Sequence, residues 1–225
     1  LIAESTGKEG KGILPVIDKQ PGRLEVYGED RLFVYIEGGK NDFLNNLLKE
    51  LKDAGHPVIK IPIANNYDLG EQIFIWEFAT ALSGYWLKIN PFDQPDVEST
   101  KKITREMIRK YKEGSLEEEK PTLVEKGFNV FCDFSASSLK EVLEQFLEFV
   151  EPGGYISIHA YLPTKPLIEK ELISLVSLLR DRTKKAVTFG YGPRFLHSTG
   201  QLHKGDGGKG LFLQLVSEPS IDIPV

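Results

Sequence analysis

Apolar positions along the chain switch between the two-residue spacing typical of strands and the three-to-four-residue spacing typical of helices. The first half predicts strands at 31–37 and 57–63 and helices at 42–54, 68–89 and 96–111. The second half predicts strands at 128–133, 155–162, 186–190 and 211–216 and helices at 137–150 and 166–182. Strands that alternate with helices form parallel sheets whose faces the helices cover. We therefore expect an α/β fold built on a doubly wound parallel sheet.

A polar stretch near the middle of the chain interrupts this pattern. Residues 112–121, KEGSLEEEKP, are mostly charged and are closed by Pro121. Clusters of this composition are typical of loops and linkers. We expect a first domain at 1–112, a linker at 113–122 and a second, smaller α/β domain at 123–225.

Composition and charge narrow the class of protein. The 225 residues are 40% hydrophobic and 27% charged, with a net charge of −5, which is ordinary for a globular protein. The lysine-rich stretch from Lys101 to Lys112 alternates with apolar residues and indicates a solvated helix face. Because the sequence has no basic patch of the kind that binds nucleic acid, we expect no nucleic-acid partner.

Other features bear on the compartment. Cys132 is the only cysteine, so no disulfide can form within the chain, which fits a reducing cytoplasm. The apolar stretch Ile73–Leu87 is interrupted by polar residues and predicts a buried helix rather than a membrane span. The chain begins with Leu1 inside what resembles a helix end, without a visible signal peptide, so we expect a fragment of a longer protein.

A first group of candidate residues lies in AESTGKEGKG, residues 3–12. Glu4 precedes a polar, glycine-rich segment, where a carboxylate could act as a general base beside a bound ligand. The alternative is a helix end with a flexible, solvent-exposed tail, since exposed glutamates are common.

A second group lies in INPFDQPDVESTK, residues 89–101. Gln94 stands at the start of the predicted helix, where free backbone N–H groups favour anions. Lys101 follows seven residues later, about two helical turns on, so the two side chains can share a face. Such a lysine could meet a phosphate or a developing oxyanion. The alternative is an amphipathic helix with a solvent-exposed lysine.

The third group lies in GPRFLHSTGQLHKGDGGKG, residues 192–210, which we predict to be a polar loop after a strand. His197 and His203 fall here together with Arg194, and histidine is the residue best suited to proton transfer near neutral pH. Functional and structural roles for these histidines stay equally open on the pattern alone. His159, in the middle of a predicted strand, is more typical of a core histidine with its hydrogen bonds satisfied. The sequence has no zinc-binding spacing, and we expect no metal.

Two of these segments together resemble the glucose-6-phosphate isomerase family. AESTGK resembles the segment that carries the family's catalytic glutamate, which implies Glu4 as the base. GYWLKINPFDQPDVESTK resembles the family's C-terminal signature, whose glutamine and final lysine fall on Gln94 and Lys101. The resemblance also implies a sugar-isomerase type of α/β fold.

The third segment, GPRFLHSTGQLHKG, resembles the end of proteins in which a transaldolase is fused to the isomerase. The family places its ring-opening histidine between the glutamate and lysine segments, where this chain has only His56. HSTGQLHKG resembles that missing segment but follows the lysine, which implies His197 as the ring-opening residue. We place His203 and Arg194, with Gln94, among the substrate-binding residues.

The resemblance implies interconversion of glucose 6-phosphate and fructose 6-phosphate through a cis-enediol, with no cofactor. It further implies a sugar-phosphate substrate, a cytoplasmic enzyme without membrane contact, and upstream isomerase and transaldolase domains in the same polypeptide; it is compatible with a homodimer. We expect Glu4, Gln94 and Lys101 to converge on one cleft. The alternative is a sugar-phosphate-binding module of the same fold without catalytic activity.

Overall fold

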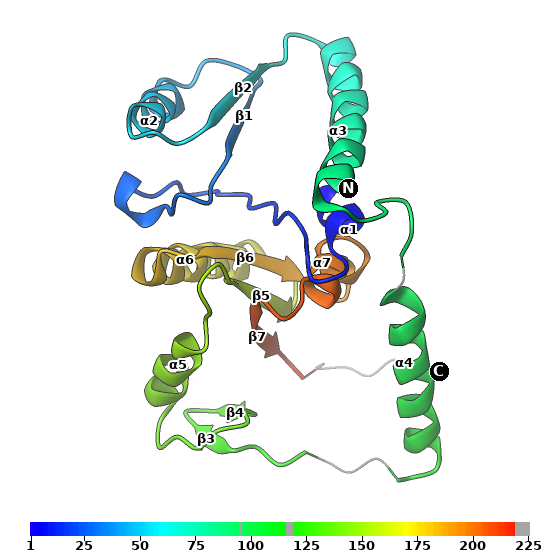
Figure 1. The fold of residues 1–225 in the computed structure, drawn as a ribbon. Coiled ribbons are helices and arrows are strands. Elements are labelled where there is room, and N and C mark those ends of the chain that lie inside the picture. Colours follow the sequence, from blue (N-terminus) through cyan, green and yellow to red (C-terminus); the bar gives the residue numbers. More distant parts are fainter. Residues whose placement is uncertain (95, 116–118, 219–225) are drawn as a thin grey trace. The chain divides into compact units, whose positions relative to one another are not determined.

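The computed structural model describes residues 1–94, 96–115 and 119–218 of the chain (Figure 1). The described part is an α/β protein with parallel sheets, as the alternating pattern predicted. Its contacts group the chain into two compact units, one made of Leu1–Asp93 with Gly153–Val225 and the other of Gln94–Pro152. Each unit is described by itself below.

The N-terminal part of the first unit contains a two-stranded parallel sheet and three α-helices. The elements are α1 (Ile2–Thr6), the 3-10 helix η1 (Leu24–Val26), β1 (Phe33–Glu37), α2 (Asp42–Asp53), β2 (Val58–Pro62) and α3 (Asn66–Leu87). Phe33 of β1 is in register with Val58 of β2. Asn65 caps α3: its side chain accepts hydrogen bonds from the first turn, while the Asp68 carboxylate accepts one from the Asn65 backbone N–H.

The C-terminal part of the first unit is a three-stranded parallel sheet in the order β6-β5-β7. Its elements are β5 (Tyr155–Tyr161), α6 (Pro166–Thr183), β6 (Ala186–Tyr191), η2 (Arg194–His197), α7 (Thr199–Gly205) and β7 (Gly210–Val216). The core lies on the central strand β5, where Ile156, Ile158 and Ala160 are fully buried. Because β6 and β7 lie on opposite sides of β5, the strand order reverses there, as in doubly wound sheets.

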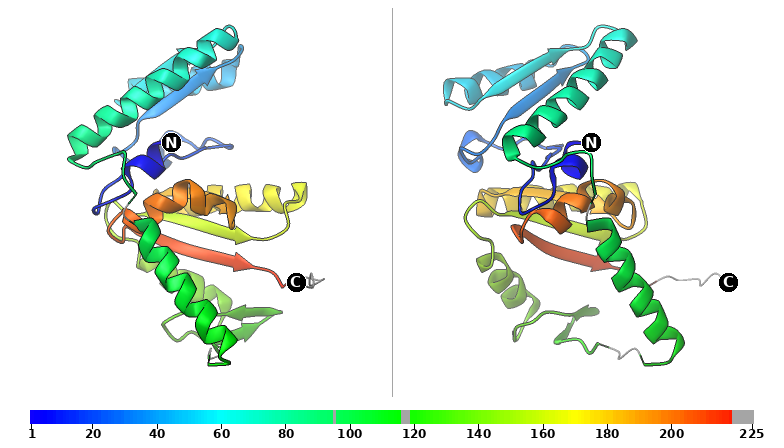
Figure 2. Two further views of the ribbon diagram at one scale, coloured as in Figure 1. Left: turned by 90° about the vertical axis from the view of Figure 1, so that its right-hand side faces the viewer. Right: turned by 45° about the vertical axis from the view of Figure 1, so that its right-hand side comes forward.

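The helices α3 and α7, which are far apart in the sequence, both pack against the short helix α1 in this unit. Figure 1 and both views of Figure 2 show α1 beside α7, with the C-terminal end of α3 next to it. Residues predicted to lie in separate domains are therefore in direct contact. The predicted division at 113–122 was based on composition, does not coincide with these compact units, and stays a prediction.

The helix α3 is not the buried helix that its apolar sequence predicted. Trp86 is 71% exposed and Phe74 68% exposed, and Phe78 and Tyr85 are exposed as well. The helix is apolar on most of its surface, and the described part of the chain covers only the side that faces α1 and Pro91. Among the described residues, no helix has the length and hydropathy required to cross a membrane.

The second unit contains α4 (Asp96–Lys112), β3 (Leu123–Glu125), β4 (Phe128–Val130) and α5 (Leu139–Glu148). We predicted a strand at 128–133 within a parallel sheet, and this was wrong: β4 is shorter and pairs antiparallel with β3. Lys126 and Gly127 connect the strands with φ of 51° and 82°, values that a two-residue hairpin turn requires. The predicted helices at 96–111 and 137–150 are confirmed.

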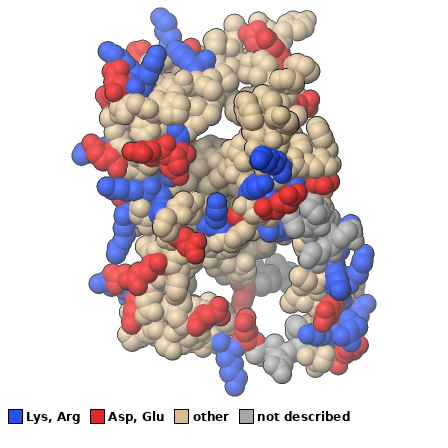
Figure 3. Space-filling view, viewed as in Figure 1, with Lys and Arg blue, Asp and Glu red and all other residues tan. Residues whose placement is uncertain are grey.

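Charged side chains of both signs are interspersed on the face of the molecule that Figure 3 shows. On the helix α4, opposite charges form pairs one turn apart, such as Arg109 with Glu113 at 2.8 Å. This agrees with the prediction of a solvated helix face, where such pairs contribute only a few tenths of a kcal/mol, on the order of 0.3–0.5.

Candidate functional site

The segment that carries Glu4 is held in place from both ends. Glu4 is half-buried in α1, between the buried residues Ala3 and Thr6. The Thr6 hydroxyl donates to the Ile2 carbonyl at 2.7 Å and accepts from the Ile13 backbone N–H at 3.0 Å. Residues 6–8 are buried and do not form the solvent-exposed tail of the alternative, whereas Glu9, Gly10, Gly12 and Ile13 are exposed.

The end of α1 packs against α7 so closely that glycine is required on both sides. A Cβ atom on Gly7 would lie 2.2 Å from the Leu202 backbone, and one on Gly205 would lie 2.2 Å from the Gly7 carbonyl oxygen. The Gly10 backbone N–H also donates to the Gly205 carbonyl at 2.8 Å. The glycines of the AESTGK and QLHKG segments thus meet at one contact.

We expect Gly7→Ala to lower the free energy of unfolding by about 1–3 kcal/mol, because backbone must move to admit the methyl group. Urea denaturation followed by circular dichroism measures this loss. Gly38→Ala is the matched control, since a Cβ atom there meets nothing within 4 Å. Equal stability of the two variants would contradict the close packing of α1 on α7.

Lys8 joins the glutamate segment to the loop that precedes Gln94. Its side chain is almost fully buried, and Nζ donates to the Asn90 carbonyl at 2.9 Å and to the Asp93 carboxylate at 3.0 Å. Nζ also donates to the Asp93 carbonyl. Lys11 adds a hydrogen bond from its Nζ to the Leu87 carbonyl at 2.7 Å. A buried ammonium needs such acceptors, because burying it without them is costly.

Lys8→Met keeps the aliphatic stem and removes the ammonium group. We expect it to lower the free energy of unfolding by about 1.5–3 kcal/mol, the range for hydrogen bonds to a charged group. Lys49→Met on the exposed surface of α2 serves as the control and should change stability little. Thermal unfolding with Tm values for both variants tests this, and an unchanged Tm for Lys8→Met would show that the contact does not stabilise the fold.

Gln94 and Lys101 lie in the second compact unit. Both side chains are exposed, Gln94 at the first position of the unit and Lys101 in α4. Pro95 lies outside the described residues. The predicted convergence of Glu4, Gln94 and Lys101 on one cleft stays a prediction, whereas the contact of Lys8 with Asn90 and Asp93 lies within the first unit.

The predicted polar loop at 192–210 is in large part helical. It forms η2 and α7 because Phe195 and Leu202 are buried and anchor it to the sheet and to α1. His197 and Arg194 are exposed on η2, whereas His203 is half-buried in α7. A small cavity of about 240 Å³ lies at the junction of α1, α3 and α7, with Ala3 and Thr199 in its wall.

His203 belongs to a hydrogen-bond network that the sequence analysis missed. Tyr155 Oη lies 2.7 Å from His203 Nδ1 and donates to the Asp206 carboxylate at 2.6 Å. His203 Nε2 lies 3.4 Å from Ser157 Oγ, which accepts from the Thr188 hydroxyl at 3.2 Å. The polar alternation of Tyr155, Ser157 and His159 along β5 is the signal that could have revealed this face.

The surroundings of the two central histidines disfavour their charged forms. Burial lowers the pKa of His203 to about 4, with a smaller contribution from His159, while Asp206 opposes the shift. Burial also lowers the pKa of His159, whose ring packs 4.3 Å from Phe195 and 5.1 Å from His203 between centroids. His159 is half-buried, and its Nε2 has no hydrogen-bond partner among the described residues, so the expectation of a core histidine with satisfied hydrogen bonds was wrong.

The lowered pKa of His203 predicts a loss of stability in mild acid. In the unfolded chain His203 takes up a proton near its ordinary pKa of 6.5, whereas the folded protein resists protonation until about pH 4. The unfolded state therefore binds more protons in this window, and the free energy of unfolding falls as pH falls from about 6.5 toward 4.

Urea denaturation at about pH 7.5 and about pH 5 measures the effect. We expect His203→Gln to lose less stability between the two pH values than the unsubstituted protein, because the titrating group is gone. His197→Gln, at an exposed position, should retain the full pH dependence. An unreduced pH dependence in His203→Gln would contradict a neutral, buried His203.

Several curated proteins that are similar to this chain carry the name glucose-6-phosphate isomerase. The chain is similar to glucose-6-phosphate isomerases. It is 37% identical to that of Fusobacterium nucleatum subsp. nucleatum over 141 residues, which is 45% of this chain and 31% of the relative. It is 35% identical to that of Leptospira biflexa serovar Patoc over 139 residues and 33% identical to that of Bacillus cereus over 140 residues, with the same coverage.

The matched region covers less than half of this chain and about a third of each relative. The chain spans about a third of the length of the curated relatives that it matches. The alignment with the Fusobacterium protein runs over 141 positions but covers only 45% of the 225 residues of this chain, so part of the relative's aligned sequence has no counterpart here. No family model matches the chain, and no solved structure matches it.

Proposed function

We propose that this chain is the C-terminal part of a glucose-6-phosphate isomerase and contributes Glu4, Lys101 and a histidine to the interconversion of glucose 6-phosphate and fructose 6-phosphate. Identity of 33–37% to curated isomerases supports the enzyme class. The AESTGK and FDQPDVESTK segments support the assignment of residues.

One observation carries the proposal furthest: the segments that resemble the isomerase meet around α1. Lys8, four residues after Glu4, donates hydrogen bonds to Asn90 and Asp93. Asp93 is the residue immediately before Gln94 in the sequence. The other end of the same segment packs on α7, through Gly7 and Gly205. The first unit thus holds the segment of Glu4 against Asn90 and Asp93 on one side and against α7 on the other. This supports the proposal that the candidate residues of these segments serve one site.

In this proposal each candidate residue has a chemical role. Glu4 takes the proton from one of the two adjacent sugar carbons and returns it to the other, through a cis-enediol. Lys101 stabilises the negative charge that develops on the sugar oxygens during the transfer. Gln94 donates hydrogen bonds to the phosphate or a hydroxyl, and Arg194 and His203 assist binding. The proton transfer uses only these side chains and calls for no cofactor or metal.

The histidine that opens the sugar ring comes from a different part of the chain than in the family pattern. Part of the aligned Fusobacterium sequence has no counterpart in this chain, which fits the lack of the family's histidine segment between Glu4 and Lys101. The packing of α7 on α1 brings the HSTGQLHKG segment against the glutamate helix. His197, exposed at the end of η2, is then available to exchange protons with solvent and substrate.

The exposed helix α3 supports the view that the chain works as part of a larger enzyme. Its large apolar side chains, including Phe74 and Trp86, are more exposed than is usual for a stable monomer. We place the remainder of the isomerase, from the same polypeptide, against this helix. That polypeptide is cytoplasmic, and the sequence at 192–205 favours a fusion with transaldolase.

A coupled assay for conversion of fructose 6-phosphate to glucose 6-phosphate tests the proposal. We expect activity from the natural polypeptide that contains this chain, and little or none from residues 1–225 alone, because the missing part positions the phosphate. Glu4→Gln in the natural polypeptide should lower kcat by at least about 10²-fold, while Glu9→Gln on the exposed surface should not. Full activity of Glu4→Gln would rule out Glu4 as the base.

A further inference from the structure

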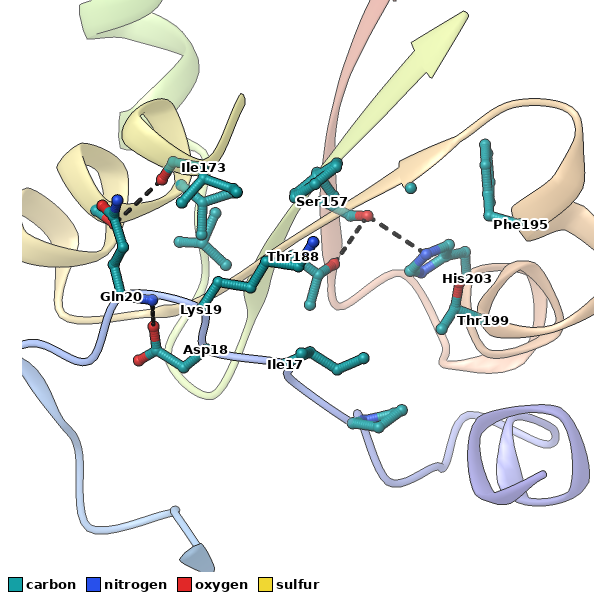
Figure 4. A pocket seen from close by; sticks show the side chains of 16 residues that line it. Ile17, Asp18, Lys19, Gln20, Ser157, Ile173, Thr188, Phe195, Thr199 and His203 are labelled. Carbon is teal, nitrogen blue, oxygen red and sulfur yellow. Dashed lines mark hydrogen bonds between the residues drawn. The ribbon is translucent and has the colours of Figure 1, made fainter. Parts of the chain in front are cut away.

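A second cavity, of about 280 Å³, lies on the sheet of the first unit. It is enclosed by β5 and β6, by α6, by α7 and by residues 15–20 (Figure 4). In Figure 4, Ser157, Thr188 and His203 point toward one another on the sheet side, and Ile17 lies on the segment across from them. Ile173 and Phe195 contribute apolar wall.

The hydrogen bonds fix which nitrogen of His203 carries the proton. The single hydroxyl proton of Tyr155 is donated to the Asp206 carboxylate, so Tyr155 Oη can only accept from His203. Nδ1 of His203, at 2.7 Å, must therefore be the protonated nitrogen. Nε2 keeps its lone pair and faces the Ser157 hydroxyl at 3.4 Å, at the wall of the cavity.

The network that fixes this tautomer is shielded from water. Tyr155 is 6% exposed and Asp206 is 4% exposed. The burial that lowers the pKa of His203 also keeps the ring neutral near pH 7, so that Nε2 acts as an acceptor there. The long 3.4 Å contact between Nε2 and Ser157 Oγ leaves both groups able to form a better hydrogen bond with a ligand.

The charged side chains around the cavity are already paired. Asp18 accepts from Arg180 at 2.9 Å and from Tyr27 at 2.8 Å. Lys19 pairs with Glu169 at 2.5 Å. Since His203 is neutral as well, the lining offers hydroxyl groups and an imidazole acceptor but no uncompensated charge, and it does not suit a phosphate or a carboxylate.

We propose that this cavity is a second binding site, which takes a small uncharged polyol or sugar. One hydroxyl of the ligand donates a hydrogen bond to Nε2 of His203. The Ser157 and Thr188 hydroxyls form hydrogen bonds with the adjacent hydroxyl of the ligand. Carbon-bound hydrogens of the ligand pack on Ile173 and Phe195. Tyr155 and Asp206 are positioning residues that hold His203 in the accepting tautomer. This site uses His203, which the proposed isomerase also counts among its substrate-binding residues, but binding of a polyol here requires no isomerase activity.

Nitrogen-15 NMR of histidine-labelled protein tests the tautomer. We expect His203 to carry its proton on Nδ1 in the free protein and to shift toward the Nε2-protonated form in Tyr155→Phe. Protonation of Nε2 in the unsubstituted protein would overturn the proposal, because that nitrogen could not then accept from a ligand.

Titration with D-glucitol, followed by amide chemical shifts, tests binding. We expect saturable shifts at residues of β5, α7 and 15–20, and a Kd that rises about two- to tenfold in Ser157→Ala, the range for one lost hydrogen bond. Ser174→Ala, on the exposed side of α6, is the control and should bind as the unsubstituted protein does. Inorganic phosphate should cause no shifts in this region. Absence of saturable shifts with glucitol, or displacement of glucitol by phosphate, would overturn the proposal, whatever the isomerase assay gives.

Discussion

The buried ammonium group of Lys8 is the interaction on which the arrangement of the first unit depends. A lysine that is 1% exposed cannot exchange its hydrogen bonds with water, so it must find acceptors within the fold. It finds them in the loop after α3, on Asn90 and Asp93. The segment that carries Glu4 can therefore take up its observed position only when α3 and its following loop are also in place.

Glycine complements this polar contact on the opposite side of α1. Gly7 and Gly205 permit two backbones to approach within a distance that any side chain would prevent. The result is that α1 lies between a loop held by charge and a helix held by close packing. Both contacts involve residues of the segments that resemble the isomerase, which gives those residues a structural reason to occur together.

The regular elements could be predicted from the sequence because each carries its own local signal. The strands at 33–37 and 58–62 and the helix at 42–53 follow from spacing and end residues such as Gly55. The helix α7 was missed because Leu202 is its only large apolar residue within a polar, glycine-rich sequence. The hairpin of β3 and β4 was missed because its strands have three residues each, too few to establish a period.

The candidate site was predictable in part for a similar reason. Glu4 lies within a recognisable motif. Nothing in the sequence distinguishes Lys8 from an exposed lysine, and only the folded structure shows that it is buried. Tyr155 and Asp206 are 51 residues apart in sequence, and only the sheet and α7 bring them to hydrogen-bond distance. Long-range contacts of this kind carry no local pattern. The exposure of α3 likewise depends on what lies against it, which its own sequence does not specify.

The central claim is that the histidine segment, relocated to α7 and η2, serves the site of Glu4. The most direct measurement compares two reactions of the natural polypeptide that contains this chain. We predict that His197→Ala slows turnover of cyclic glucose 6-phosphate by about 10²–10⁴-fold, the contribution of a general acid–base group. The same variant should still exchange the C2 proton of an open-chain analogue, because Glu4 performs that step. Equal and minor losses in His197→Ala and His203→Ala would contradict the account and leave the α7 segment with a structural role only.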